Sequence, residues 1–381
     1  MSNSIALPYG QAILSAPPAG TCREDRIAPS YAALRPMLAH PISDEFPVYK
    51  ELVPRLVKMD ANDHPNQLLA HVLSVCCGYS YSDAATVAMI MARLGLAENR
   101  CRMISQTVDA MSIRSTAFLV QSKDGRVVIL CYRGTEPLNP LTYLTVSDVY
   151  PEKLRFSVGA EGPFDVHAGF YRNVRATRYE VIQALERALN GKSVLEEEEK
   201  AGTARTGEEH GRERLEALYI TGHSLGGAMA ALMTIMLLNE EADGSPRGRL
   251  FQKLRGLYTF GQPMIGNPKF AAACDRALKG KPMMRYIYQK DAVSTLPPKT
   301  TGDFAHFGPE MVYQQNEWHL REEKTGQARS VLALPEAFIA YVARQLSVSR
   351  LIPFNYSIPD HVPQSYISAL TPGTVTSEFG D

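Results

Sequence analysis

The apolar positions of this chain follow two different spacings along its length. Between residues 67 and 96 they recur at the period of a helix, with Ser82-Asp83 at the start of a second helix and Gly95 near its end. Short apolar runs rich in β-branched and aromatic residues predict buried strands. These runs lie at residues 116–120, 127–132, 218–221, 256–260, 284–288 and 311–313.

Strands and helices alternate along most of the chain, which is the order expected of an α/β fold. Helices are predicted at residues 176–189, directly after residue 224, and at 335–346, where Pro335 suits a first helical turn. Asp124-Gly125 predicts a β-hairpin between the first two strands. We therefore expect a mostly parallel central sheet with helices on both faces.

The domain organisation is predicted to be simple. Residues 1–45 are rich in Pro, Ala and Ser without a steady period, which predicts an irregular N-terminal arm. Residues 46–381 are expected to form a single α/β domain, because 45% apolar residues supply a sizeable core. The charged stretch at 192–214 is typical of a solvated loop or helix face, and we interpret it as an insertion in that domain.

The sequence Gly222-His223-Ser224-Leu225-Gly226 joins a predicted strand directly to a predicted helix. Such a junction brings two backbones close together, so glycine is required on both sides of the turn. The turn holds the serine in a strained conformation, with its hydroxyl above the sheet and the Leu225 amide beside it at the helix N-terminus. The pattern and its strand–helix context together predict a nucleophile elbow, with Ser224 as the nucleophile.

Composition and charge narrow the classes of function. Forty basic and forty acidic residues leave no net charge, so there is no electrostatic support for nucleic acid, an anionic membrane or a polyanionic substrate. The six cysteines lack the spacing of metal ligands, so we expect buried free thiols, no metal and no cofactor. No apolar run is long enough to span a bilayer, and the N-terminus lacks the basic start of a signal peptide; we expect a cytoplasmic protein.

A serine hydroxyl needs a base, and the base needs an acid that fixes its tautomer. Asp291 directly follows the strand at 284–288 and precedes a turn, so we predict that it is the acid. Three histidines lie downstream of the serine. His319 lies on a polar strand and is expected at the surface. His361 lies in a late loop, where a base that reaches back to the elbow belongs, and His306, beside aromatic residues, is its rival.

Five spaced motifs resemble, in the same order, those of the class 3 lipases, the fungal-type triacylglycerol lipase family. The motifs extend over about residues 68–361, and together they are far more specific than any one alone. They are Tyr132-Arg133-Gly134-Thr135, Val166-His167-Ala168-Gly169-Phe170, Thr221-Gly222-His223-Ser224-Leu225-Gly226-Gly227-Ala228, Tyr258-Thr259-Phe260-Gly261-Gln262-Pro263-Met264-Ile265-Gly266-Asn267 and Asp291-Ala292-Val293.

This resemblance implies an α/β-hydrolase fold of the class 3 lipase type. It implies Ser224 as the nucleophile, Asp291 as the acid and His361 as the base. The base is assigned because Asp360-His361 matches the family's late Asp-His, whereas the motif around His306 is structural in the family.

The resemblance also implies an oxyanion hole formed by the main-chain amide and hydroxyl of Thr135 together with the Leu225 amide. Each donor aimed at a developing oxyanion typically contributes about 3 kcal/mol. Two further histidines match the family motifs, His167 and His223, and we interpret both as structural.

The segment after Thr135 departs from the family pattern. Residues 137–147 carry no charge and predict a lid within residues 136–150, but two prolines and a long spacing to Asp148 leave its form and any interfacial activation open. Residues 137–146 and 351–354 are expected to line the acyl site, with core packing as the alternative for the second segment.

The resemblance implies a serine carboxylic-ester hydrolase, a lipase or esterase that cleaves acylglycerols or similar hydrophobic esters and contacts a lipid–water interface. A phospholipase or an acyltransferase would use the same three residues. A lipase-fold scaffold that binds partners without hydrolysis is the alternative from another class, and the presence of Ser224, Asp291 and His361 together disfavours it.

Overall fold

A computed structural model describes residues 47–108, 113–134, 151–159, 161–195, 214–242, 244, 246–321, 323–328, 359–373 and 375. All of them belong to the second of two units, Pro36–Asp381. Several predicted features lie outside the described residues: the arm at 1–45, Thr135 and the lid at 136–150, most of the charged stretch at 192–214, the helix at 335–346, and residues 351–354.

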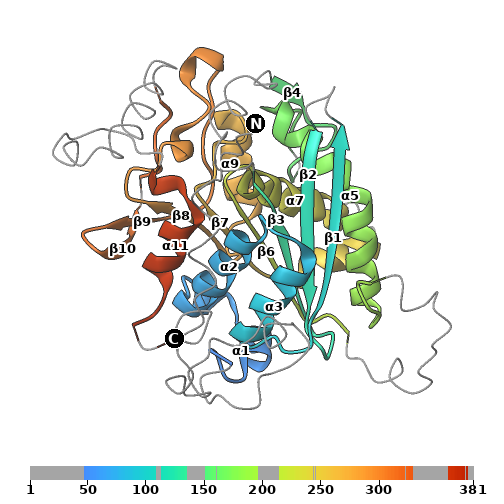
Figure 1. Ribbon diagram of the computed structural model, residues 1–381. Helices are drawn as coiled ribbons and strands as arrows, with labels where there is room; N and C mark the ends of the chain where they lie inside the picture. The colour runs from blue at the N-terminus through green and yellow to red at the C-terminus, as the bar shows by residue number, and fades with distance from the viewer. Residues whose placement is uncertain are drawn as a thin grey trace, which may run out of the picture. The chain divides into compact units, whose positions relative to one another are not determined.

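The described residues contain an eight-stranded sheet in the order β1-β2-β3-β6-β7-β8-β9-β10 (Figure 1). Strands β4 and β5 pair separately as a two-stranded ribbon. The strands are β1 (Arg100–Val108), β2 (Ile113–Gln121), β3 (Val127–Tyr132), β4 (Pro151–Lys153), β5 (Asp165–His167), β6 (Ala217–His223), β7 (Leu254–Phe260), β8 (Met283–Tyr288), β9 (Glu310–Gln314) and β10 (Glu317–Arg321).

The centre of the sheet is parallel. Strands β3, β6, β7, β8 and β9 pair with one another in parallel, whereas β1 and β2 at one edge and β10 at the other pair antiparallel. Strands β2 and β3 form the hairpin predicted around Asp124-Gly125, with Gln121 opposite Val128. Because parallel strands place their carboxyl ends at one edge of a sheet, the segments after β3, β6, β7 and β8 emerge together there.

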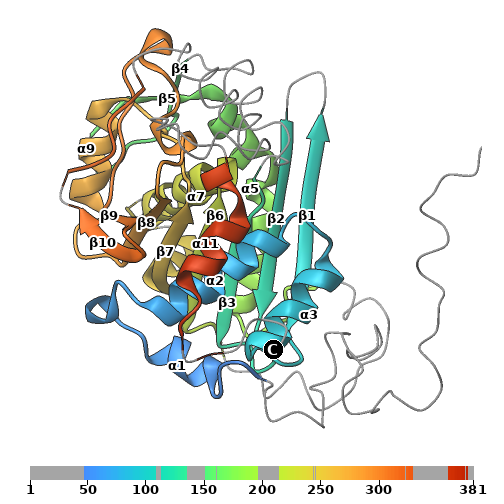
Figure 2. The same cartoon turned by 60° about the vertical axis from the view of Figure 1, so that its left-hand side comes forward.

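Helices cover both faces of this sheet (Figures 1 and 2). The α-helices are α1 (Leu52–Lys58), α2 (Gln67–Tyr79), α3 (Ala84–Leu94), α5 (Ala168–Leu189), α7 (Leu225–Ala242), α8 (Arg249–Gln252), α9 (Pro268–Ala277) and α11 (Pro363–Leu370). Short 3-10 helices are η2 (Ala61–Asp63), η5 (Pro246–Gly248), η6 (Val293–Thr295), η7 (Lys299–Thr301) and η9 (Pro359–His361).

Two buried clusters lie on opposite faces because successive side chains of a strand point in opposite directions. In β3, Val128 and Leu130 pack with α5, α7, α8 and α9, whereas Val127 and Ile129 pack with α1, α2, α3 and α11. Side chains on both faces of the strand are therefore buried, which explains its unbroken apolar run. This arrangement confirms the predicted mostly parallel sheet with helices on both faces, the architecture of an α/β-hydrolase fold.

Two elements differ from the sequence predictions. Strand β1 was not predicted, because Ile104 is its one fully buried residue and an edge strand of this kind carries little apolar signal. Helix α5 begins at Ala168 instead of near residue 176. Its start is fixed by the His167 side chain, whose ring accepts a hydrogen bond from the Phe170 amide.

The described cysteines are free thiols, as expected; Cys76, Cys77, Cys131 and Cys274 are buried and Cys101 is half-buried. None of the described helices combines the length and the apolar character that crossing a membrane requires. The described residues also contain no group of three or more His, Cys, Asp or Glu side chains arranged to hold a metal ion.

Candidate active site

Ser224 occupies the single position between the end of β6 at His223 and the start of α7 at Leu225. Its φ is 59°, in the left-handed region that side chains other than glycine rarely adopt. The Ser224 amide donates a hydrogen bond to the Phe260 carbonyl at the end of β7, at 2.9 Å, and this bond holds the strained residue in place. Ser224 thus has the backbone conformation of the predicted nucleophile elbow.

The glycines around Ser224 are required by contact distances. A Cβ atom at Gly222 would lie 2.2 Å from the Gly226 carbonyl oxygen, and one at Gly226 would lie 2.1 Å from the Tyr132 carbonyl oxygen. Helix α7 therefore starts in contact with the main chain of both β6 and β3. A larger residue at either glycine would push the helix away from the sheet and move Ser224 with it.

Asp291 and His361 form a buried acid–base pair. His361 Nδ1 lies 2.8 Å from Asp291 Oδ2 and 3.0 Å from Oδ1, so the imidazole donates from Nδ1 to the carboxylate. The carboxylate also accepts a hydrogen bond from the Val293 amide at 2.8 Å and from the Tyr366 hydroxyl at 2.5 Å. Burial by itself would raise the pKa of Asp291, but the nearby His361 imidazole and these hydrogen bonds lower it below its ordinary value.

The bond to Asp291 leaves the other ring nitrogen of His361 as the basic one. Among the described residues, neither His361 Nε2 nor Ser224 Oγ has a hydrogen-bond partner, although both atoms are buried. Ser224 is 1% exposed and His361 is 4% exposed. A buried nitrogen lone pair and a buried hydroxyl without partners are the two groups that a nucleophile and its base would use.

Gly261 joins the nucleophile to the acid–base pair. It follows Phe260, whose carbonyl accepts the Ser224 amide, and its φ is 57°. A Cβ atom on Gly261 would lie 2.6 Å from Asp291 Oδ2 and 2.8 Å from His361 Nδ1. The His361 ring also lies 4.5 Å from the ring of His223, the residue before the serine. The fold therefore brings Ser224, Asp291 and His361 together at the carboxyl ends of β6, β7 and β8.

One of the two predicted oxyanion donors can be placed. The Leu225 amide is the first of α7, where amides have no partner within the helix and the positive end of the helix dipole lies. Thr135 lies outside the described residues, but Gly134 before it is described. A Cβ atom on Gly134 would lie 3.2 Å from Ser224 Cβ, so the chain that leads to Thr135 passes directly beside the nucleophile.

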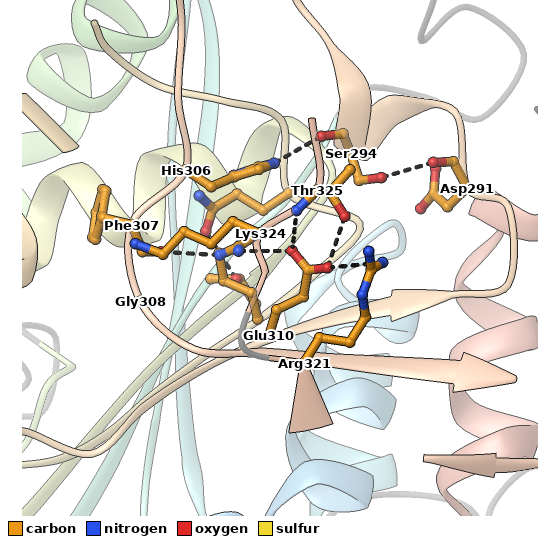
Figure 3. Close-up of polar contacts among 12 residues, drawn as sticks. Asp291, Ser294, His306, Phe307, Gly308, Glu310, Arg321, Lys324 and Thr325 are labelled. Atoms are coloured by element: carbon orange, nitrogen blue, oxygen red, sulfur yellow. Dashed lines mark hydrogen bonds and ion pairs between the residues drawn. The ribbon is translucent and has the colours of Figure 1, made fainter. Parts of the chain in front are cut away.

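His306, the rival base, lies beneath the loop that carries the acid (Figure 3). Its Nε2 donates to the Ser294 carbonyl at 2.7 Å, and the Ser294 hydroxyl in turn donates to the Asp291 carbonyl at 2.8 Å. Burial, and to a lesser degree the positive charge of Arg285, lowers the pKa of His306 well below its ordinary value. His306 thus supports the main chain of the acid loop and makes no bond to the Asp291 carboxylate.

A buried ion pair extends this support. Arg285 donates to Glu310 Oε2 at 2.8 Å and to the Phe307 carbonyl, next to His306, at 2.9 Å. Thr325 donates to the same carboxylate through its amide and its hydroxyl, at 3.0 and 2.7 Å (Figure 3). Both Glu310 carboxylate oxygens are hydrogen-bonded, and the ion pair joins β8 to β9 next to the acid loop, although Arg285 Nη1 has no partner among the described residues.

The remaining histidines lie as the sequence indicates, with one addition. His319 is exposed on β10. His167 is buried at the start of α5, where its ring stacks on Phe170 with centroids 3.8 Å apart. His223 is also buried, but it contacts His361 as well as Tyr81, which the sequence did not indicate.

Sequence reasoning missed the two tyrosines at this site. Tyr366 on α11 donates to the acid, and Tyr81, between α2 and α3, hydrogen-bonds to His223. These contacts join residues 75 and 142 positions apart, so no local spacing pattern could reveal them.

Part of this chain matches the model of a known protein family. Residues 129–301 match the family model described as lipase (class 3), which confirms the predicted resemblance for that segment. A triacylglycerol lipase OBL1 from Arabidopsis thaliana is 30% identical over 220 residues, which cover 52% of this chain and 39% of the relative. A lipase from Rhizopus niveus is 27% identical over 210 residues, which cover 54% of this chain and 44% of the relative.

The chain therefore spans less than half the length of these two curated relatives. Among solved structures, the Rhizomucor miehei lipase propeptide complex aligns with a TM-score of 0.49 and 20% identity, over 78% of each chain.

Proposed function

We propose that the chain is a serine carboxylic-ester hydrolase with Ser224 as its nucleophile, a proposal supported by the match of residues 129–301 to the class 3 lipase family model. The observation that carries the proposal is the buried Asp291–His361 pair: His361 Nε2 and the Ser224 hydroxyl are both buried, and neither has a hydrogen-bond partner among the described residues. Three groups of these types in this connectivity are what acyl transfer to a serine requires.

The proposed reaction has two halves. His361 Nε2 takes the proton of Ser224 Oγ while that oxygen attacks the ester carbonyl, and Asp291 stabilises the imidazolium that forms. The resulting oxyanion accepts hydrogen bonds from the Leu225 amide and from Thr135. His361 then gives its proton to the departing alkoxide, which leaves an acyl-enzyme on Ser224.

Hydrolysis of the acyl-enzyme repeats the same steps with water. His361 takes a proton from water, the hydroxide attacks the acyl carbon, and Ser224 leaves with the proton that His361 returns. The cycle consumes one ester and one water and yields one alcohol and one carboxylic acid. No group beyond the protein's own side chains and amides is needed to balance it.

We propose lipids or other hydrophobic esters as the substrates. The family supports this class, and both the Arabidopsis and the Rhizopus relatives are named lipases. The absence of net charge favours an uncharged ester over nucleic acid or another polyanion. Contact with a lipid–water interface and a cytoplasmic location are parts of the same proposal.

The test is hydrolysis of a chain-length series of p-nitrophenyl esters, triacylglycerols and phospholipids by the full chain and by Ser224→Ala. We expect saturable ester hydrolysis by the wild type and its loss in Ser224→Ala, with fluorophosphonate labelling confined to the wild type. Preference for phospholipid, or acyl transfer to an added alcohol, would replace the lipase assignment with one of its two alternatives. A wild type that neither hydrolyses esters nor reacts with fluorophosphonate would establish the non-catalytic scaffold instead.

A further inference from the structure

His223 makes two hydrogen bonds with defined directions. Its Nε2 lies 2.6 Å from the main-chain carbonyl oxygen of His361, and its Nδ1 lies 2.8 Å from the Tyr81 hydroxyl. Because a carbonyl oxygen can only accept, Nε2 carries the proton and donates. Nδ1 is then a lone pair that accepts from Tyr81. The tautomer of His223 is thus set from both sides.

The charge of His223 is also fixed. Burial, and to a lesser degree the neighbouring His361, lowers the pKa of His223 to about 3. The ring therefore stays neutral across the physiological range, and it can neither take nor release a proton in a reaction near pH 7. What it can do is hold its partners in position.

The partner that it holds is the proposed base. In the described part of the chain, the His361 ring is fixed by the Nδ1 bond to Asp291, and the His361 main chain is fixed by the bond from His223. His361 ends η9, a turn of three residues, which has little rigidity of its own. Fixing both the ring and the backbone leaves Nε2 only one direction in which to point.

Tyr81 connects this bond to the other side of the nucleophile. A Cβ atom on Gly134 would lie 2.3 Å from the Tyr81 hydroxyl oxygen, 2.6 Å from the His223 carbonyl oxygen and 3.2 Å from Ser224 Cβ. The Tyr81 ring also faces the Arg133 guanidinium, whose central carbon lies 5.7 Å from the ring centroid. The Tyr81 hydroxyl therefore contacts the main chain that leads to Thr135.

From these contacts we propose that Tyr81 and His223 form a positioning relay, which sets the orientation of His361 Nε2 relative to Ser224 and to the chain that leads to Thr135. The inference rests on the proposed function. His223 and Tyr81 touch neither substrate nor transferred proton; they act through His361. Their loss is expected to lower kcat while leaving KM and the fold unchanged.

Two variants of His223 distinguish the effect of its hydrogen bond to His361 from the effect of changing the size of the side chain. The amide nitrogen of glutamine reaches about as far as Nε2 of histidine, so His223→Gln keeps a donor for the His361 carbonyl. Asparagine reaches only about as far as Nδ1, so His223→Asn keeps the polar group near Tyr81 and loses the bond to His361. We expect kcat to stay within about threefold in His223→Gln and to fall about 30- to 100-fold in His223→Asn, at constant KM and with an unchanged far-UV circular dichroism spectrum.

Tyr81→Phe completes the cycle. If Tyr81 acts only through His223, its removal lowers kcat about 5- to 10-fold in the wild type and has no further effect in the His223→Asn background. Tyr49→Phe is the matched control, because the Tyr49 hydroxyl bonds to the buried His71 at 2.7 Å with ring centroids 5.8 Å apart, against 6.0 Å for Tyr81 and His223. We expect Tyr49→Phe to lower Tm and leave kcat unchanged.

Equal kcat in His223→Gln and His223→Asn would overturn the relay, as would an equal effect of Tyr81→Phe in both backgrounds. A loss of kcat in Tyr49→Phe that matches the loss in Tyr81→Phe would do the same. These outcomes are read from a wild type whose activity depends on Ser224. If that activity itself is missing, the proposed function fails and not the relay alone.

Discussion

The Tyr366 hydroxyl donates a 2.5 Å hydrogen bond to Asp291 Oδ2, the same carboxylate oxygen that His361 Nδ1 contacts at 2.8 Å. Helix α11, which carries Tyr366, begins two residues after His361. The short segment that supplies the proposed base therefore also supplies a second donor to the proposed acid. The segment formed by η9 and α11 therefore fixes the position of the proposed base relative to the proposed acid.

We expect Tyr366→Phe to lower kcat moderately, by about 3- to 10-fold, because the Asp291 carboxylate keeps two of the three donors found among the described residues. The Tyr288 amide, which donates to the same hydroxyl at 3.1 Å, would also lose its acceptor. We therefore expect the free energy of unfolding of this variant to be about 1 kcal/mol lower than that of the wild type. Steady-state kinetics and urea denaturation measure the two effects, and Tyr179→Phe, on an exposed side chain of α5, is the control. Unchanged kcat in Tyr366→Phe would show that Asp291 needs no third donor.

Gly261→Ala should separate the acid from the base. The new methyl group would lie 2.6 Å from Asp291 Oδ2 and 2.8 Å from His361 Nδ1, closer than atoms can approach, so their hydrogen bond must break or lengthen. We expect kcat to fall about 100-fold or more, because the imidazole loses both its orientation and its stabilising charge.

Gly280→Ala is the matched control for Gly261→Ala. Both glycines have a positive φ, 57° at Gly261 and 78° at Gly280, but a Cβ atom on Gly280 would meet no atom within 4 Å. The control shares the backbone strain of about 1 kcal/mol without the clash. It should lose stability and retain kcat; comparable kcat in the two variants would contradict the placement of the acid–base pair.

The two candidate bases differ in what their removal should do. We expect His361→Ala to lose nearly all turnover, about 10³-fold or more, in the molecules that remain folded, and to lower Tm because the buried Asp291 carboxylate loses a donor. His306→Ala should also lower Tm, because the buried Ser294 carbonyl loses its donor and a cavity opens, but its folded molecules should retain turnover. Kinetics per folded molecule distinguish the two. An inactive His306→Ala beside an active, folded His361→Ala would reverse the assignment of the base.

The strands of the parallel centre were predictable because their side chains are buried on both faces. In β3 this gives an unbroken apolar run, and in β6 and β7 it gives mostly apolar runs; all three were found to within two residues of the observed bounds. Strand β1 has no such run, since only Ile104 is fully buried, and the start of α5 depends on a cap made by His167. Elements set by a single side chain or by partial exposure left no periodic signal.

The site divides in the same way. Ser224 directly follows β6 and Asp291 lies three residues after β8, so a local sequence pattern was enough to propose both residues. His361 ends the three-residue turn η9, and its assignment required resemblance to a family. Tyr366 and Tyr81 reach the site only because the fold packs α11 and the turn after α2 against it. Such support depends on tertiary contacts, which sequence spacing does not encode.

Acid should unfold this protein from a higher pH than its carboxylates alone would explain. Burial lowers the pKa of His71 to about 4 and those of His167 and His223 to about 3, and it lowers the pKa of His306 well below its ordinary value. In the unfolded chain each of these four imidazoles has a pKa of about 6.5. Above that pH both states are uncharged at these positions, so their full contribution to stability is present.

As the pH falls below about 6.5, the unfolded chain binds protons that the folded chain does not, and each histidine then favours unfolding by about 1.4 kcal/mol per pH unit. Together, four such histidines should reduce a typical free energy of unfolding of about 5–15 kcal/mol to zero within a few pH units. We expect Tm to be flat above about pH 7 and to fall steeply from about pH 6.5 towards pH 4. In His71→Gln, urea denaturation over the same range should give a slope smaller by about one proton. A Tm that stays constant between pH 7 and pH 5 would mean that these rings accept protons inside the fold.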